Sequence, residues 1–258
     1  MRTLVAFPLA VVLALAPLSA LAEEFPEAPR TSLWSGVRVG LLSFGGNFYS
    51  WTAERERVES ARNLVSWGPV VELDVGVRLG QRYVPYVGIE YARVGAGHRF
   101  EGEADVAASS AFFAVGFRYS GAKLDRVGFL SDLSVGFRRV TVWSSTQSYR
   151  LTSFEILRLG LGAEIRLSRL VTLSPMMQVT SGVMSGADGD IAFASGQPDG
   201  LSHPPYSNGQ GIAGEKSYLV LSVMCGVHFD LFASQGGARG PKNDVPFRVP
   251  LGTGDPFR

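Results

Sequence analysis

Hydrophobic and polar residues alternate one by one through several separate stretches of the chain. Between residues 71 and 78, Val71, Leu73, Val75 and Val77 alternate with Glu72, Asp74, Gly76 and Arg78. A period of two predicts a β-strand whose two faces meet different surroundings. The alternation recurs near 87–92, 113–118, 132–138, 157–166 and 219–231, and more weakly near 36–42 and 171–180. The pattern therefore predicts eight strands and an all-β fold.

The connections between these strands alternate in length. The intervals 44–68, 94–108, 143–153 and 183–215 are long and polar, whereas 80–83, 120–126 and 167–169 are short. Successive connections of an up-and-down barrel lie at opposite ends, so one end would carry the long loops and the other the tight turns. Outer-membrane barrels show this asymmetry, with the long loops outside the cell. We therefore expect an eight-stranded antiparallel up-and-down transmembrane β-barrel.

The position of glycine indicates which face of the strands lies inside. A secreted lipocalin-like barrel would have its apolar face inside, and a membrane barrel would have it outside. A water-exposed strand gains nothing from glycine, but a narrow lumen gains room for long neighbouring side chains. The glycines of the predicted strands all lie on the polar face: Gly36, Gly40, Gly76, Gly88, Gly116, Gly136, Gly160, Gly162 and Gly226. The polar face is therefore predicted to line the lumen.

Charged residues on this polar face balance one another, with six of each sign. An eight-stranded barrel has just enough interior for side chains to fill it. We therefore predict an ion-pair network that closes the lumen, made of Arg38, Glu72, Asp74, Arg78, Glu90, Arg118, Asp132, Arg138, Arg158, Glu164, Arg166 and Asp230. Among the strand positions that are predicted to face outward, only Arg93 and Arg139 are charged, and both lie near the long-loop end.

The two ends of the chain read differently from the strands. An apolar stretch followed by Ala20-Leu21-Ala22 predicts a cleavable signal peptide over residues 1–22. A retained anchor helix is the competing interpretation, which Pro8 and Pro17 disfavour. A periplasmic segment, 23–32, would precede the barrel, 33–232, and a Pro/Gly-rich disordered periplasmic tail, 233–258, would follow it.

Composition narrows the choice of partners. The net charge is only +1, so a nucleic-acid partner is not expected. Glycine accounts for 31 of 258 residues and charged residues for 18%, which suits closely packed strands. The single cysteine, Cys225, excludes an intramolecular disulfide and a cysteine-cluster metal site.

With these features the chain resembles the small eight-stranded outer-membrane β-barrels, the group that includes the OmpA transmembrane domain, OmpX and OmpW. The resemblance is architectural and covers roughly residues 33–232. In that family the closing strand carries a glycine and spaced apolar residues that the barrel-assembly machinery reads, and Gly226, Phe229 and Leu231 are similar to this signal. Met224 departs from it, since a polar residue is usual there. The resemblance implies assembly by that machinery into a Gram-negative outer membrane, with outer-membrane lipid and lipopolysaccharide as partners.

Other motifs carry little chemistry. Gly209, Gly211 and Gly214 match a dinucleotide fingerprint in letters, but no strand precedes them and no helix follows. Asp188 and Asp190 are too few for a calcium site. His228 shares the lumen face with Asp230 and Ser222, which leaves a nucleophile site conceivable. We expect no catalytic, cofactor or metal site.

Three functions are compatible with these features. The first is a structural or surface-interaction barrel that displays four loops. The second is OmpW-like passage of small hydrophobic solutes, which apolar residues on the inner parity would allow: Leu42, Phe112, Leu130, Ile156, Met176 and Met224. The third is a lipid A-modifying barrel enzyme.

Overall fold

Eight long antiparallel strands make up most of the molecule. The computed structural model describes residues 28–52, 56–100, 105–121, 127–144, 148–168, 170–189 and 215–234. The long strands are β1 (Thr31–Thr52), β3 (Gly68–Leu79), β4 (Tyr83–Val94), β5 (Ala107–Ser120), β6 (Val127–Trp143), β7 (Ser148–Arg166), β8 (Val171–Gly189) and β9 (Ser217–Ser234). A short strand, β2 (Glu56–Ser60), and two short helices, α2 (Ala61–Leu64) and η2 (His98–Phe100), lie between them.

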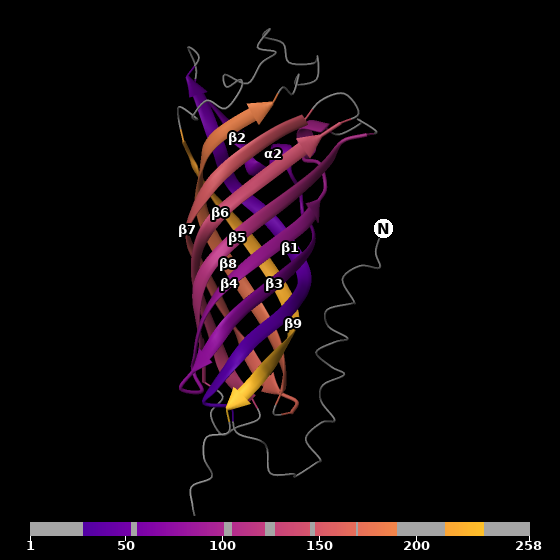
Figure 1. The fold of residues 1–258 in the computed structure, drawn as a ribbon. Helices are drawn as coiled ribbons and strands as arrows, with labels where there is room; N and C mark the ends of the chain where they lie inside the picture. The colour runs from indigo at the N-terminus through magenta and orange to yellow at the C-terminus, as the bar shows by residue number, and fades with distance from the viewer. Residues whose placement is uncertain are drawn as a thin grey trace, which may run out of the picture.

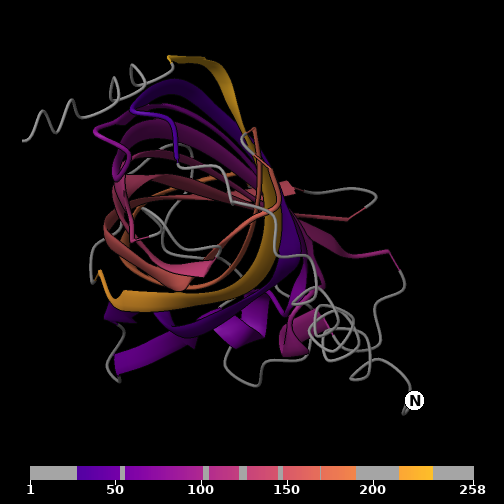
Figure 2. The same ribbon diagram turned by 90° about the horizontal axis from the view of Figure 1, so that it is seen from below.

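The sheet closes on itself. From β3 to β9 each strand pairs with the next along the chain, and β1 pairs with β3 on one side and β9 on the other. Val37, for example, lies opposite both Leu73 and Val227. Figure 1 shows the tilted strands, and Figure 2 shows the closed ring seen from below. The predicted all-β, eight-stranded antiparallel barrel is confirmed, with β2 as an additional hairpin partner of the upper part of β1.

A tight turn joins β3 to β4 at the end opposite the predicted long loops. Gly80 and Gln81 both have positive φ, 59° and 72°, and the Arg82 amide donates to the Leu79 carbonyl. Leu79 pairs with Tyr83, so residues 80–82 form a three-residue hairpin loop, and glycine at position 80 accommodates its positive φ. The Gln81 side chain is buried and its Nε2 donates to the Ala28 carbonyl at 2.9 Å. The segment before β1 is thereby attached to this end of the barrel.

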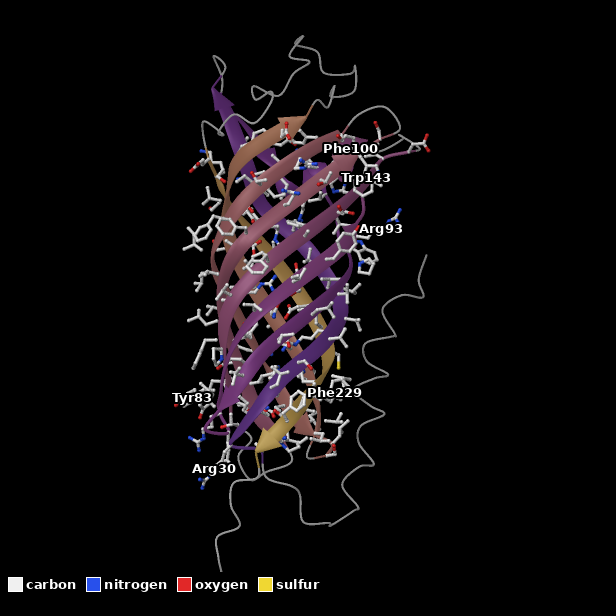
Figure 3. The ribbon with its side chains drawn as sticks, viewed as in Figure 1. Arg30, Tyr83, Arg93, Phe100, Trp143 and Phe229 are labelled. Carbon is white, nitrogen blue, oxygen red and sulfur yellow. The ribbon has the colours of Figure 1, made fainter. Side chains whose placement is uncertain are left out.

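The outer face of the barrel carries an apolar belt. Outward side chains such as Val39, Ile89 and Leu159 are about half exposed, whereas the lumen arginines are almost fully buried. The predicted assignment of the polar face to the inside is therefore confirmed. Figure 3 shows outward side chains along the wall, with Arg93 near the loop end and Tyr83 near the turn end.

The height of this belt fits a bilayer. On β6 the outward residues are apolar or small from Val127 to Phe137, a run of eleven residues. On β4 the run from Tyr83 to Tyr91 has nine. A tilted strand needs about 9–11 residues to cross the hydrocarbon core of a membrane. Because side chains of this kind would be costly to expose to water all round a barrel, the belt is the surface that meets lipid.

Above the belt the strands continue, where loops were predicted. The β1 strand runs to Thr52, β6 and β7 fill most of 143–153, and β8 runs to Gly189. The predicted loop boundaries were wrong because, at this level, the inner face of the strands becomes apolar and the outer face becomes polar. The inward residues become apolar, as at Val140, and the outward residues become polar, as at Arg139, so the single pattern used below the rim no longer applies.

An irregularity in β7 overturns one assignment. The pairing with β8 shifts between Thr152 and Ser153 and again between Glu155 and Leu157. An extra residue in one strand reverses the faces beyond it. Consequently Ile156, predicted to face the lumen, is 58% exposed on the outside, and Glu155 is fully buried inside.

The described residues cover only part of the predicted domain boundaries. The predicted signal peptide, 1–22, and residues 235–258 of the predicted tail lie outside the described residues. The barrel strands begin at Thr31 and end at Ser234, slightly beyond the predicted 33–232. No helix among the residues that the structure describes is long and apolar enough to cross a bilayer.

Candidate functional site

The interior of the barrel holds buried ion pairs in three layers. The layer at the turn end joins strands that are far apart in sequence. Arg78 donates from Nε to Asp230 at 2.9 Å and from Nη2 to Glu164 at 3.1 Å. Arg166 donates to the same two carboxylates, at 3.3 Å and 2.7 Å. Two arginines and two acids therefore neutralise one another here.

The middle layer is centred on Asp74. Its Oδ2 accepts from Arg38 Nη1 at 2.9 Å and from Arg118 Nη1 at 3.1 Å. Arg118 also donates from Nε to Asp132 at 2.9 Å, and the Tyr86 hydroxyl donates to the other oxygen of Asp132 at 2.6 Å. A single carboxylate shared by two arginines links three strands across the lumen.

The upper layer contains Glu155, a buried acid that the regular alternation of the sequence did not predict to face the lumen. Arg138 donates to Glu90 at 2.7 Å and also pairs with Glu155 through two nitrogens. Arg158 donates to Glu72 at 3.2 Å and pairs with Glu90. A bidentate arginine–carboxylate contact is stronger and more directional than a simple ion pair. This layer spans β3, β4, β6 and β7.

All twelve residues of the predicted network are buried, and each makes at least one ion pair. With Glu155 the described lumen holds six arginines and seven carboxylates. Aromatic rings complete the packing: Arg78 lies 4.4 Å from the Trp34 ring and Arg158 lies 4.1 Å from the Phe112 ring. Because a buried charge without its partner is strongly unfavourable, these contacts hold the strands in one register.

His228 has different partners from those considered in the sequence. Its Nδ1 lies 2.9 Å from Ser174 Oγ, and its Nε2 lies 3.3 Å from Asp74 Oδ2. The imidazole also stacks on Trp34 at 4.6 Å. Asp230 instead accepts from Ser32 and the turn-end arginines. The side chains of His228 and Ser174 are both fully buried in the barrel interior.

Above the ion pairs the interior is apolar. Inward side chains of the upper strands join residues of α2 and η2 in one buried cluster, which includes Phe44, Phe48, Leu64, Val140 and Tyr218. Four of these five are at most 1% exposed, and Phe44 is 2% exposed. The barrel thus has a charged interior at membrane depth and an apolar core above it.

The remaining predicted sites are placed as follows. Gly226 faces the lumen against Arg38, and a Cβ there would lie 2.3 Å from Arg38 Cγ. Phe229 and Leu231 face outward, each 40% exposed. Asp188 forms an exposed pair with Arg150 at 3.6 Å, while Asp190 and the 209–214 motif lie outside the described residues. Within the described ranges no group of three or more residues could hold a metal ion.

Comparisons with known proteins identify similar solved structures. Neisserial surface protein A is 9% identical, with a TM-score of 0.46, over 78% of this chain and 99% of that one. OprG from Pseudomonas aeruginosa is 12% identical, with a TM-score of 0.42, over 80% and 99%. Ail of Yersinia pestis, also solved with the heparin analogue sucrose octasulfate, is 10% identical, with a TM-score of 0.37, over 77% and 99%.

No protein-family model and no curated protein matches the chain. Identities and TM-scores this low transfer no residue role, and the barrel itself is established by the strand pairing described above. The fold that the strand pairing shows is a closed, eight-stranded antiparallel β-barrel.

Proposed function

We propose that the protein is an integral outer-membrane barrel with a closed lumen, which acts as a structural or surface-interaction protein. The observation that carries this proposal is the layered ion-pair network. Six arginines and seven carboxylates fill the interior at membrane depth with side chains that are at most 3% exposed. An apolar core then occupies the interior above them. Among the described residues, the burial of both sets of side chains supports a lumen that is closed to polar solutes.

Conductance in planar bilayers tests this proposal. The full-length protein is refolded, shown by gel migration to be folded, and added to a bilayer at moderate salt. We expect no steady single-channel conductance, because opening a path requires breaking ion pairs in all three layers. The control is a variant with Arg158→Ala and Glu90→Ala, which removes two large side chains from the upper layer. Steady current steps from the wild-type barrel would contradict the closed-lumen proposal.

A second candidate, passage of small hydrophobic solutes, is favoured by one observation. The interior above the ion pairs is lined mostly with apolar side chains such as Leu42 and Val140. A hydrophobic solute entering from the loop end would meet these side chains and leave through the barrel wall. Uptake of a radiolabelled alkane by cells with and without the protein tests this candidate. Equal uptake would remove it.

We propose that the protein is not an enzyme. This proposal is supported by His228 and Ser174, which are in contact with each other but fully buried. A His228→Ala variant should leave the lipid A profile of the cells unchanged by mass spectrometry. A change in that profile, with normal barrel levels in the membrane, would instead support catalysis.

A further inference from the structure

A shallow groove crosses the outer wall of the barrel near the loop end. Its volume is about 510 Å³, and its lining comes from β4, β5, β6, β7 and β8. The outward residues at its lower side are Ile89, Phe113 and Phe137, which are 48–65% exposed. Those at its upper side are Arg139, Thr152 and Ser185.

The groove exists because small residues interrupt a row of large ones. Ala111 lies opposite Tyr91 on β4 and Arg139 on β6, and its outward neighbour along β5 is Ser109. Two residues further down the strand the outward position is Phe113, a large ring. A methyl group among an arginine, a tyrosine and a phenylalanine leaves the wall hollow at that point.

The groove is positively charged as well as partly apolar. Its ten lining residues include Arg138 and Arg139 but no carboxylate. Arg138 points inward and is paired with Glu90 and Glu155. Arg139 is exposed on the outer face and forms no ion pair with a described residue. An occupant would therefore meet one uncompensated guanidinium with hydroxyl groups beside it.

The groove also lies at the level where the outer face changes polarity. On β6 the outward series changes from Phe137 to Arg139, and on β7 from Phe154 to Thr152. This level is where the hydrocarbon of a bilayer meets its headgroups. The long-loop end of an outer-membrane barrel faces outside the cell, so the groove lies in the outer leaflet.

From this geometry we propose that the groove binds lipopolysaccharide through its lipid A part. A lipid A phosphate pairs with Arg139, with Thr152 and Ser185 as hydrogen-bonding neighbours, and an acyl chain packs along Ile89, Phe113 and Phe137. A zwitterionic phospholipid carries its own positive charge and complements a lone guanidinium less well than a net anionic lipid does. The proposal rests on the outer-membrane orientation proposed above, and it goes beyond the structural role.

Retention of lipid A during purification tests this site. The full-length protein is extracted from outer membranes in mild detergent, and lipid A per protein is measured by mass spectrometry. The variants are Arg139→Gln, which removes the charge, and Ala111→Phe, which fills the groove. The controls are Arg93→Gln, the other outward arginine, and Val115→Phe, an outward site on β5 below the groove. Gel migration before and after boiling shows that each variant is folded.

We expect Arg139→Gln to retain about tenfold less lipid A, as loss of one charge-assisted contact implies. Ala111→Phe should also retain less because its ring fills the groove, and both controls should be unchanged. Equal retention by all five proteins would overturn the proposal. So would an equal fall in Arg93→Gln, since any rim charge would then suffice. Groove-dependent retention of phospholipid in place of lipid A would overturn the choice of ligand. A protein that is absent from outer membranes would instead overturn the orientation on which the site rests.

Discussion

Arg138 and Arg139 are neighbours in the chain but lie on opposite sides of the barrel wall. Arg138 is 1% exposed and bound to Glu90 and Glu155 inside, whereas Arg139 is exposed on the outer face. Adjacent residues of a regular strand point to opposite faces. Two adjacent charged residues therefore require polar surroundings both inside and outside the barrel at the same height. The pair marks the level at which the barrel leaves the membrane, because only there is the outer surface polar while the interior is still charged.

These two arginines should respond differently to truncation. Arg138→Ala leaves two buried carboxylates without their shared partner, and breaking a buried pair costs about 3–5 kcal/mol. Arg139→Ala removes an exposed side chain at the rim and should change stability by about 0.5 kcal/mol or less. Urea unfolding of the refolded barrel in phospholipid vesicles, followed by tryptophan fluorescence, measures both. Similar losses for the two variants would contradict the assignment of one arginine to each face.

The limits of the lipid-facing belt are tested by placing arginine at two heights. Leu159 lies midway along the belt on β7 and is 50% exposed, while Thr141 lies above the belt on β6. Leu159→Arg should destabilise the barrel by about 2–4 kcal/mol, since arginine near the bilayer midplane is costly, and Thr141→Arg by about 0–1 kcal/mol. The same unfolding measurement in vesicles compares them. Equal costs would mean that the belt does not coincide with the hydrocarbon core.

Alternation predicted the strands, loop lengths predicted the barrel, and the position of glycine assigned the twelve charged residues to the lumen. These predictions were possible because every second residue of a regular strand faces the same side, and because only the inside of a membrane barrel tolerates so many arginines. Glu155 was missed because a bulge breaks that constancy. Phe154 and Leu157 are three residues apart and both face outward, which a regular strand does not allow, and this spacing was the available signal.

The upper barrel was mistaken for loops for a different reason. Residues such as Val140 and Leu151 face inward while Arg139 and Thr152 face outward, the reverse of the pattern used to identify strands below. Along each of these strands the side chains keep alternating between the two faces, but the inward ones become apolar and the outward ones polar. This exchange indicates that the surroundings outside the barrel change from lipid to water, and not that the strand ends. The partners of His228 could not be predicted at all, because Ser174 and Asp74 are brought to it by register across strands distant in sequence.

The closed sheet predicts resistance to detergent. Every long strand is hydrogen-bonded to a neighbour on both sides. The barrel therefore has no free sheet edge at which unfolding could start. Without boiling, the protein in outer-membrane extracts should migrate on a detergent gel at a different position from the boiled sample. Migration at one position in both samples, together with recovery in the soluble periplasmic fraction, would contradict a membrane barrel.

Close packing inside the barrel makes one glycine difficult to replace. A Cβ at Gly136 would lie 2.0 Å from the Phe113 carbonyl oxygen and 2.8 Å from the Phe112 ring. The backbone oxygen cannot move without disturbing the β5–β6 pairing, so Gly136→Ala should destabilise the barrel by about 1–3 kcal/mol, the usual cost of overpacking. Gly45→Ala is the matched control, because a Cβ there meets nothing within 4 Å. The temperature at which each variant loses its unboiled gel position measures the difference. A Gly136→Ala barrel as heat-stable as the control would show that the two strands are not packed this closely.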